Sequence, residues 1–201
     1  MNRKIGMTAS LINVTAVFLF AVSMLLGFDF GSYFSSMFIA FSFVPVICAY
    51  ACFSNENAKL AGFTAVSFAA VYAAVILLVY FAQLTTVRAG SLTGQAAQIL
   101  DFKQFGLFFN YDLLGYGCMA LATFFAGLTV EIYTKADKWL KALLLIHGVF
   151  FLSCLTLPLL GVFTSDGEAW VGVAVLEFWC VYFIPVGILS FLHFTKCKTP
   201  Q

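Results

Sequence analysis

The stretch VGVAVLEFWCVYFIPVGILSFLHF, residues Val171–Phe194, contains a single carboxylate, Glu177, among side chains that are almost all apolar. About 20 consecutive apolar residues are enough for a helix to cross the hydrocarbon core of a bilayer. The stretch therefore predicts a membrane-spanning helix. An ionisable residue inside such a helix is costly, so Glu177 calls for a functional or structural reason.

Composition extends the same conclusion to the whole chain. Of its 201 residues, 63% are hydrophobic and 9% are charged, and the mean hydropathy is +1.01. A soluble domain has about a quarter of its residues charged. The composition predicts an integral membrane protein in contact with lipids, and the net charge of +1 argues against a nucleic-acid partner.

Six apolar runs are long enough to span a bilayer. They cover approximately residues 7–28, 33–53, 60–88, 113–132, 139–163 and 170–195. We therefore predict an all-α fold, a polytopic membrane helical bundle of six transmembrane helices that forms a single domain over residues 1–201.

The basic residues predict how the bundle is oriented. Six spans place both termini on one side, and that side collects eight of the ten Lys and Arg residues. Loops rich in Lys and Arg stay in the cytoplasm, so both termini are expected to be cytoplasmic. The eight residues are Arg3, Lys4, Lys59, Lys135, Lys138, Lys141, Lys196 and Lys198.

One long connection, residues 91–111, lies on the predicted outer side. It reads SLTGQAAQILDFKQFGLFFNY, and its second half is too aromatic for a solvated loop. Such a segment is expected in the membrane interface or folded back over the bundle. Loops of this length often carry function. Two interpretations stay open, a lid over a site and an interfacial brace.

Depth along the helices brings several polar residues to one level of the outer leaflet. Glu177 is seven residues from Trp170, which places it about 10 Å into the membrane. A pocket at this level would have Glu177 as its acid, an Arg88–Asp112 pair as its gate, and hydrogen-bonding groups that orient the ligand. The predicted ligand-binding residues are Glu177, Arg88, Asp112, Tyr116, Gln83 and Tyr80. The alternative is a structural clamp made by the same side chains.

His147 is the other titratable group inside a predicted span. It is either part of a proton-linked relay or a neutral histidine that hydrogen-bonds to a neighbouring helix. On the fourth run, small residues recur at helical spacing, which predicts a seam for close helix packing, within the bundle or with another protomer or membrane partner. The seam consists of Gly115, Cys118, Ala122 and Ala126.

Motifs for metal, phosphate or covalent chemistry are missing from the sequence. It has no phosphate-binding glycine loop, no H-E-x-x-H, no G-x-S-x-G and only two histidines. We predict no metal site and no cofactor, and an enzyme is the least expected function.

Two segments, YFAQLTTVR (Tyr80–Arg88) and FFNYDLLGYG (Phe108–Gly117), together with the six-span layout, give the chain a family resemblance. It resembles small six-span integral membrane proteins of bacteria that have no assigned activity. The resemblance implies a multi-pass protein of the bacterial cytoplasmic membrane and carries no catalytic residue across.

The function expected from these features is binding or transport of a small-molecule or lipidic ligand, cationic ligands included, through the outer-leaflet polar pocket. The alternative is a non-catalytic scaffold or accessory subunit of a larger complex, which would use the seam of the fourth run.

Overall fold

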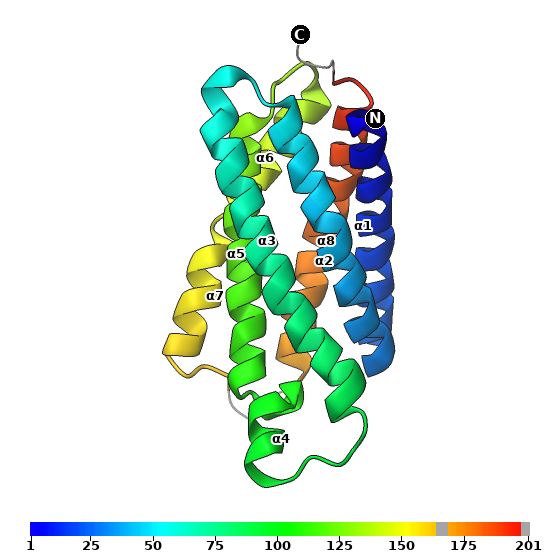
Figure 1. Cartoon of the computed structure of the whole chain (residues 1–201), viewed down its shortest axis with the longest axis vertical. Helices are drawn as coiled ribbons and strands as arrows, with labels where there is room; N and C mark the ends of the chain where they lie inside the picture. Colours follow the sequence, from blue (N-terminus) through cyan, green and yellow to red (C-terminus); the bar gives the residue numbers. More distant parts are fainter. Residues whose placement is uncertain (164–168, 198–201) are drawn as a thin grey trace.

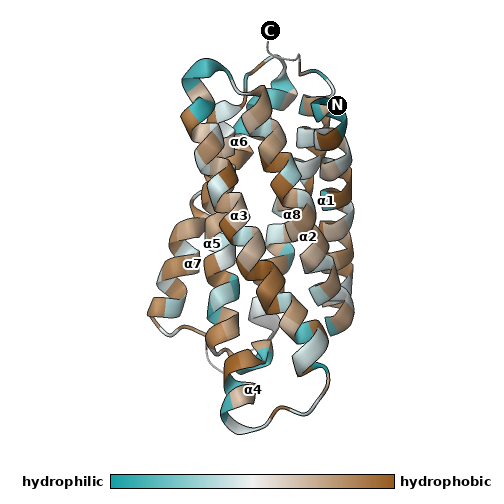
Figure 2. Ribbon diagram, viewed as in Figure 1, coloured by the Kyte–Doolittle hydropathy of each residue, from teal (hydrophilic) through white to brown (hydrophobic). Residues whose placement is uncertain are grey.

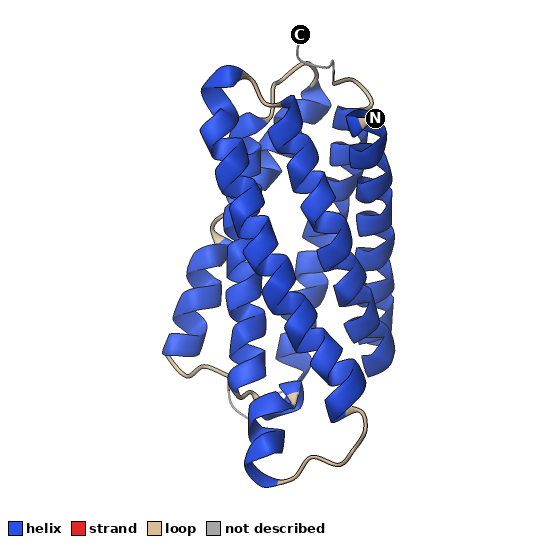
Figure 3. Cartoon of the chain, in the orientation of Figure 1, coloured by secondary structure: helices blue, strands red, loops and turns tan. Residues whose placement is uncertain are grey.

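The computed structural model describes residues 1–163 and 169–197, and within them all regular structure is helical (Figure 3). The helices are α1 (Asn2–Leu25), α2 (Asp29–Phe53), α3 (Lys59–Ala82), α4 (Gly94–Leu100), α5 (Leu107–Thr129), α6 (Lys135–His147), α7 (Phe150–Leu159) and α8 (Ala169–Phe194). Six helical segments are long and apolar enough to cross a membrane, so the predicted six-span, all-α architecture is confirmed.

The long helices run up and down between two ends of the bundle (Figure 1). The terminal end is the one where α1 begins and α8 finishes, and the α4 end is the opposite one. The connections from α2 to α3 and from α5 to α6 lie at the terminal end. This end therefore collects the predicted cytoplasmic group of Lys and Arg residues, except Lys198, which lies outside the described residues.

The helices pack as a ring in the order α8, α1, α2, α3, α5 and α6, and α6 packs back on α8. Only the terminal half of the bundle is closed in this way. In the α4 half the neighbour of α5 is α7, which packs chiefly on α5 and leans away from the other helices (Figure 1).

The fifth predicted span, 139–163, is divided into α6 and α7 at Gly148. A Cβ atom on residue 148 would lie 2.9 Å from the side chain of Phe124 on α5, so the aromatic ring occupies the space that a side chain would need. Glycine also weakens a helix interior, because it has more backbone freedom to lose. The bend that follows turns α7 away from α8.

The fourth span begins earlier than the sequence predicted. Its helix α5 starts at Leu107 and not at residue 113, because the aromatic segment assigned to the outer connection continues the helix. The connection between α3 and α5 contains a π-helical turn over Gln83–Val87, then α4, and then a 3₁₀ turn over Phe102–Gln104. Asp112 therefore lies inside α5 and not at its N-terminus.

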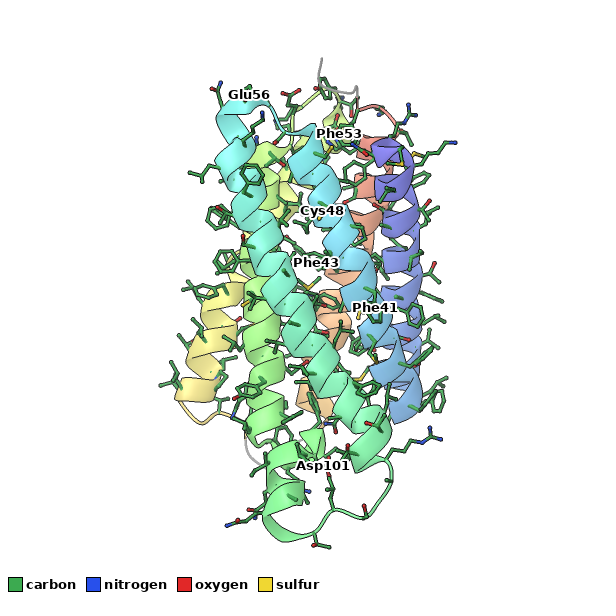
Figure 4. All side chains as sticks on the ribbon, in the orientation of Figure 1. Phe41, Phe43, Cys48, Phe53, Glu56 and Asp101 are labelled. Atoms are coloured by element: carbon green, nitrogen blue, oxygen red, sulfur yellow. The ribbon has the colours of Figure 1, made fainter. Side chains whose placement is uncertain are left out.

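Most residues of the long helices are hydrophobic (Figure 2), and many of their large apolar side chains are exposed on the outside of the bundle. On α2, Phe41 is 55% exposed, whereas Phe43 is buried in the core (Figure 4). A helix turns about 100° per residue, so side chains two positions apart point to nearly opposite faces of the helix. An exposed apolar surface on every long helix is the pattern expected when lipid, not water, is the solvent.

Candidate functional site

Asp112 is buried in the α4 half of the bundle, 4% exposed and one to two turns into α5. Its carboxylate lies close to the hydroxyl of Tyr80 on α3, and this hydroxyl is also close to Ser36 on α2. The described residues provide no ion pair between Asp112 and a Lys, Arg or His. A buried carboxylate without a cationic partner is costly, which makes this position the first candidate for a ligand site.

Three tyrosines surround this carboxylate, and together with it they form what we call the aspartate–tyrosine cluster: Asp112, Tyr72, Tyr80 and Tyr116. The rings of Tyr72 and Tyr116 are 5.9 Å apart. Asp112 Oδ1 and the hydroxyls of Tyr72 and Tyr116 are buried and have no hydrogen-bond partner among the described residues. Native proteins satisfy most buried polar atoms, so three unsatisfied atoms in one cluster need an explanation.

Trp179 on α8 closes the cluster toward the terminal end. Its ring meets Tyr116 edge to face at 5.4 Å, and its Nε1–H donates to His147 Nε2 at 3.0 Å. The other ring nitrogen of His147 lies 2.7 Å from the hydroxyl oxygen of Thr123. Because a tryptophan N–H can only donate, Nε2 is the acceptor and Nδ1 carries the proton.

His147 is therefore a neutral histidine that links three helices. Both ring nitrogens have partners, and the side chain is 1% exposed. Protonation would place a second hydrogen against the Trp179 N–H and break that bond. The geometry matches the structural alternative for His147 and gives no support to a proton-linked role.

The outer connection covers the cluster, and Gln83 fastens it there. The Gln83 amide donates to the carbonyl of Leu100 at 2.7 Å and accepts from the N–H of Phe102 at 3.0 Å. The ring of Phe102 then stacks 6.1 Å from that of Tyr80. Gln83 thus holds a cover in place, and its polar atoms are occupied by the backbone of the connection.

The predicted gate pair does not form, because the structure keeps Arg88 away from Asp112. Arg88 is exposed at the α4 end, with its guanidinium 4.7 Å from the centre of the Phe30 ring. Asp112 lies deeper because α5 begins before it. The other cation at this end, the ammonium of Lys103, forms an ion pair with Asp29, with Nζ 2.6 Å from Oδ2.

Glu177 also lies outside the cluster. Trp179 faces Tyr116, and a residue two positions earlier on the same helix points about 200° away. Glu177 is at the border between the buried Cys180 and the exposed Val181. The prediction that placed Glu177 in the pocket combined its depth along the helix with an inward-facing direction. Its Oε1 is buried without a partner among the described residues, so Glu177 is a separate feature at the edge of the lipid-facing surface.

The seam on α5 is buried inside the bundle. Ala122 and Ala126 are fully buried, and a Cβ on Gly115 would lie 2.9 Å from Ile76 on α3. Cys118 is 9% exposed. The small residue Gly115 therefore lets α3 and α5 approach each other, which fits the packing-within-the-bundle alternative for the seam.

Tyr72, Trp179 and Thr123 were missed by the sequence analysis. The sequence pattern could have identified Tyr72, because it lies on the same helix face as two predicted site residues. Spacings of three or four residues connect Tyr72, Ile76, Tyr80 and Gln83. Trp179 and Thr123 had no such signal, since their role depends on which helices are neighbours.

The described residues contain no group of three or more His, Cys, Asp or Glu side chains placed to hold a metal ion. No family model, curated protein or solved structure matches the chain. The site is therefore defined by its own geometry: a buried carboxylate, three phenols and a cover fastened by Gln83.

Proposed function

We propose that this protein binds a small ammonium compound at the aspartate–tyrosine cluster and moves it across the membrane. The observation that carries the proposal is the buried, unpartnered Oδ1 of Asp112. The two cations at the same end, Arg88 and Lys103, are held by Phe30 and Asp29. A cationic ligand would supply the missing partner.

The surroundings of Asp112 suit an ammonium ion. Its N–H groups would donate to the carboxylate and to phenol oxygens, which accept as well as donate. The rings of Tyr72, Tyr80, Tyr116 and Trp179 contribute aromatic surface, which attracts cations by about 0.5–2 kcal/mol per favourable contact. A carboxylate within an aromatic enclosure favours a small organic cation over an anion or a neutral lipid.

Access would require the connection between α3 and α5 to move. Gly90 and Gly94 have φ angles of +69° and +53°, a backbone region that glycine adopts without strain. Asp101 lies at the α4 end (Figure 4), and the ring of the next residue, Phe102, stacks on that of Tyr80 in the cluster. Release of the Gln83 clamp would lift Phe102 from Tyr80 and open the cluster from this side, which matches the lid interpretation of residues 91–111.

The orientation that we propose has both termini in the cytoplasm of a bacterial cell and the α4 end outside. The basic residues at the terminal end support it. A membrane-impermeant label should reach a tag at the N-terminus only after the cells are opened. Labelling of that tag on intact cells would show that the protein has the opposite orientation.

The binding test is a thermal-unfolding titration with methylammonium in mild detergent. The wild-type chain should gain stability as the concentration rises, because a ligand that binds only the folded state stabilises it. Asp112→Asn should remove this gain. Asp29→Asn, at the same end but exposed and paired with Lys103, is the control and should keep it. An equal gain in Asp112→Asn and wild type would disprove the site.

The transport test uses the same variants in proteoliposomes. Protein-dependent uptake of labelled methylammonium should exceed that of protein-free vesicles for wild type and Asp29→Asn. It should fall to the protein-free level for Asp112→Asn. Binding without uptake would reduce the function to ligand binding.

A further inference from the structure

We infer that one face of α6 binds an anionic phospholipid in the leaflet at the terminal end of the bundle. This face, called the α6 outer face, consists of Lys135, Lys138, Trp139, Ala142 and Ile146. A helix turns about 100° per residue, so these positions lie within about 100° of one another around the axis. The inference does not depend on the proposed function, because α6 lies in the terminal half of the bundle (Figure 1) and Asp112 in the α4 half.

The packing of α6 decides which of its sides meets the lipid. Leu140 and Leu144 are buried, and a Cβ atom on Gly127 of α5 would lie 3.1 Å from that of Leu144. The opposite side is open, because Trp139 is 68% exposed and Ile146 is 56% exposed. In a membrane-spanning bundle, an apolar surface that is exposed in this way is in contact with lipid.

Two lysines at the start of the α6 outer face carry charges that no acidic side chain neutralises. Lys135 and Lys138 are exposed, and neither forms an ion pair with another of the described residues. The next lysine, Lys141, lies on a different side of the helix, where its ammonium donates to the carbonyl of Val130 at 3.1 Å. The free charge of the face therefore comes from Lys135 and Lys138.

The acidic side chains at the terminal end already have partners within the protein. Glu56 forms an ion pair with Lys59, and the buried Asp137 lies 2.8 Å from the ring of His193. Glu131 accepts hydrogen bonds from two neighbouring side chains. Lys and Arg residues outnumber these acids at the terminal end of the described chain. The electrostatic potential at this end is therefore positive, and it attracts anions.

The order of residues along the α6 outer face matches the layers of one leaflet. The two lysines come first, at the terminal end, where the headgroup phosphates lie. Trp139 follows them, and tryptophan is enriched at the interface between headgroups and hydrocarbon. Ile146 comes seven residues later, which is about 10 Å along a helix and within the roughly 15 Å of hydrocarbon in one leaflet. The face thus offers cations to a phosphate and apolar surface to an acyl chain.

The unpaired lysines favour a particular class of headgroup. Phosphatidylglycerol carries a negative phosphate and no cation, so both lysines attract it. Phosphatidylcholine has the same phosphate but adds a quaternary ammonium, which the lysines repel. Each lysine near the membrane surface favours an anionic lipid about fivefold. The lipid that fits the α6 outer face is therefore a phospholipid whose phosphate charge is not compensated within its own headgroup.

Fluorescence quenching of Trp139 by lipids with brominated acyl chains tests the inference in liposomes. The contribution of Trp139 is the difference between the wild-type protein and Trp139→Phe. Brominated phosphatidylglycerol, diluted in unbrominated phosphatidylcholine, should quench this contribution at a mole fraction several-fold lower than brominated phosphatidylcholine does. Soluble glycerol phosphate should leave the quenching unchanged. A fall in quenching on its addition would indicate a site for free phosphate and overturn the lipid site.

Matched lysine variants show whether the preference for phosphatidylglycerol arises at α6. Lys138→Gln should weaken this preference about fivefold. Lys59→Gln removes the same charge at the same end, but from an ammonium that is paired with Glu56, and it should leave the preference unchanged. Equal quenching by the two lipids in the wild-type protein, an unchanged preference in Lys138→Gln, or an equal fall in Lys59→Gln would each overturn the inference.

Discussion

Asp112 and Asp137 are both buried aspartates, 4% and 1% exposed, and they lie in opposite halves of the bundle. Asp137 accepts hydrogen bonds from Thr134, from the backbone N–H of Tyr133 and from the His193 ring. Asp112 has an oxygen with no partner among the described residues. Burial alone does not distinguish a structural carboxylate from a candidate ligand site, whereas the supply of partners does.

The tyrosines divide in the same way. In the terminal half, the Tyr50 hydroxyl donates to Ser190 at 2.6 Å. The hydroxyls of Tyr72 and Tyr116, nearer the α4 end, have no partner among the described residues. Helix packing follows this division, because α6 closes the ring against α8 in the terminal half and α7 does not do so in the α4 half. The terminal half thus gives a hydrogen-bond partner to the Tyr50 hydroxyl, whereas the α4 half leaves buried polar atoms without partners among the described residues, and there we propose that the ligand binds.

The largest expected difference comes from one substitution made in both halves. Asp137→Asn should lower the free energy of unfolding by about 3 kcal/mol, because it breaks charge-assisted bonds and leaves His193 partly unsatisfied. Asp112→Asn should leave stability unchanged or raise it, because the protein loses a buried charge that it does not pair. Thermal unfolding in detergent measures both. Equal losses of unfolding free energy in the two variants would show that the two buried aspartates do not differ in their supply of partners.

Alanine substitutions at two glycines of α8 test how tightly the helices pack in each half of the bundle. Gly187→Ala should cost about 1–3 kcal/mol, since the new Cβ would collide with the stiff β-branched side chain of Val14 on α1. Gly172→Ala, toward the α4 end, meets nothing within 4 Å and should gain up to about 1 kcal/mol from helix propensity. The measurement is the difference between the two unfolding temperatures. A gain at Gly187 would mean that α1 and α8 are not in contact as described.

Removal of single hydroxyls tests the tyrosines. Tyr50→Phe should cost about 1 kcal/mol, the net value of a buried hydrogen bond. Tyr116→Phe should be neutral or slightly stabilising in the absence of ligand, because its hydroxyl has no partner to lose. In saturating methylammonium the same substitution should become destabilising. A cost at Tyr116 without ligand would indicate a partner inside the protein.

The smallest effect is expected at the surface of the α4 end. Lys103→Gln removes the ion pair with Asp29, in which both side chains are more than half exposed. Exposed pairs contribute about 0–1 kcal/mol, and salt weakens them further. Stability should change little at low salt and not at all at high salt. A large loss would show that this pair, and not Gln83, holds the outer connection.

Much of the fold could be predicted from the sequence. Apolar length alone places six spans, because the membrane fixes how long each must be. The break at Gly148 and the early start of α5 at Leu107 were not predicted, since the first depends on Phe124 and the second on aromatic residues that fit a helix and an interface equally well.

The site could be predicted only in part. Asp112, Tyr116 and Tyr80 were identified because depth along a helix follows from residue count. Glu177 and Arg88 were placed with them at similar depth, but their directions around the helix axis lead elsewhere. The His193–Asp137 pair joins α8 to α6, two helices whose contact no sequence pattern reveals.

Isotope-edited infrared difference spectroscopy tests the central claim most directly, because it observes the Asp112 carboxyl group itself. With aspartate labelled at the side-chain carboxyl carbon, saturating methylammonium should change a carboxyl stretching band of the wild-type protein, and the change should vanish in Asp112→Asn. A spectrum that methylammonium leaves unaltered, or an alteration that persists in Asp112→Asn, would contradict the account.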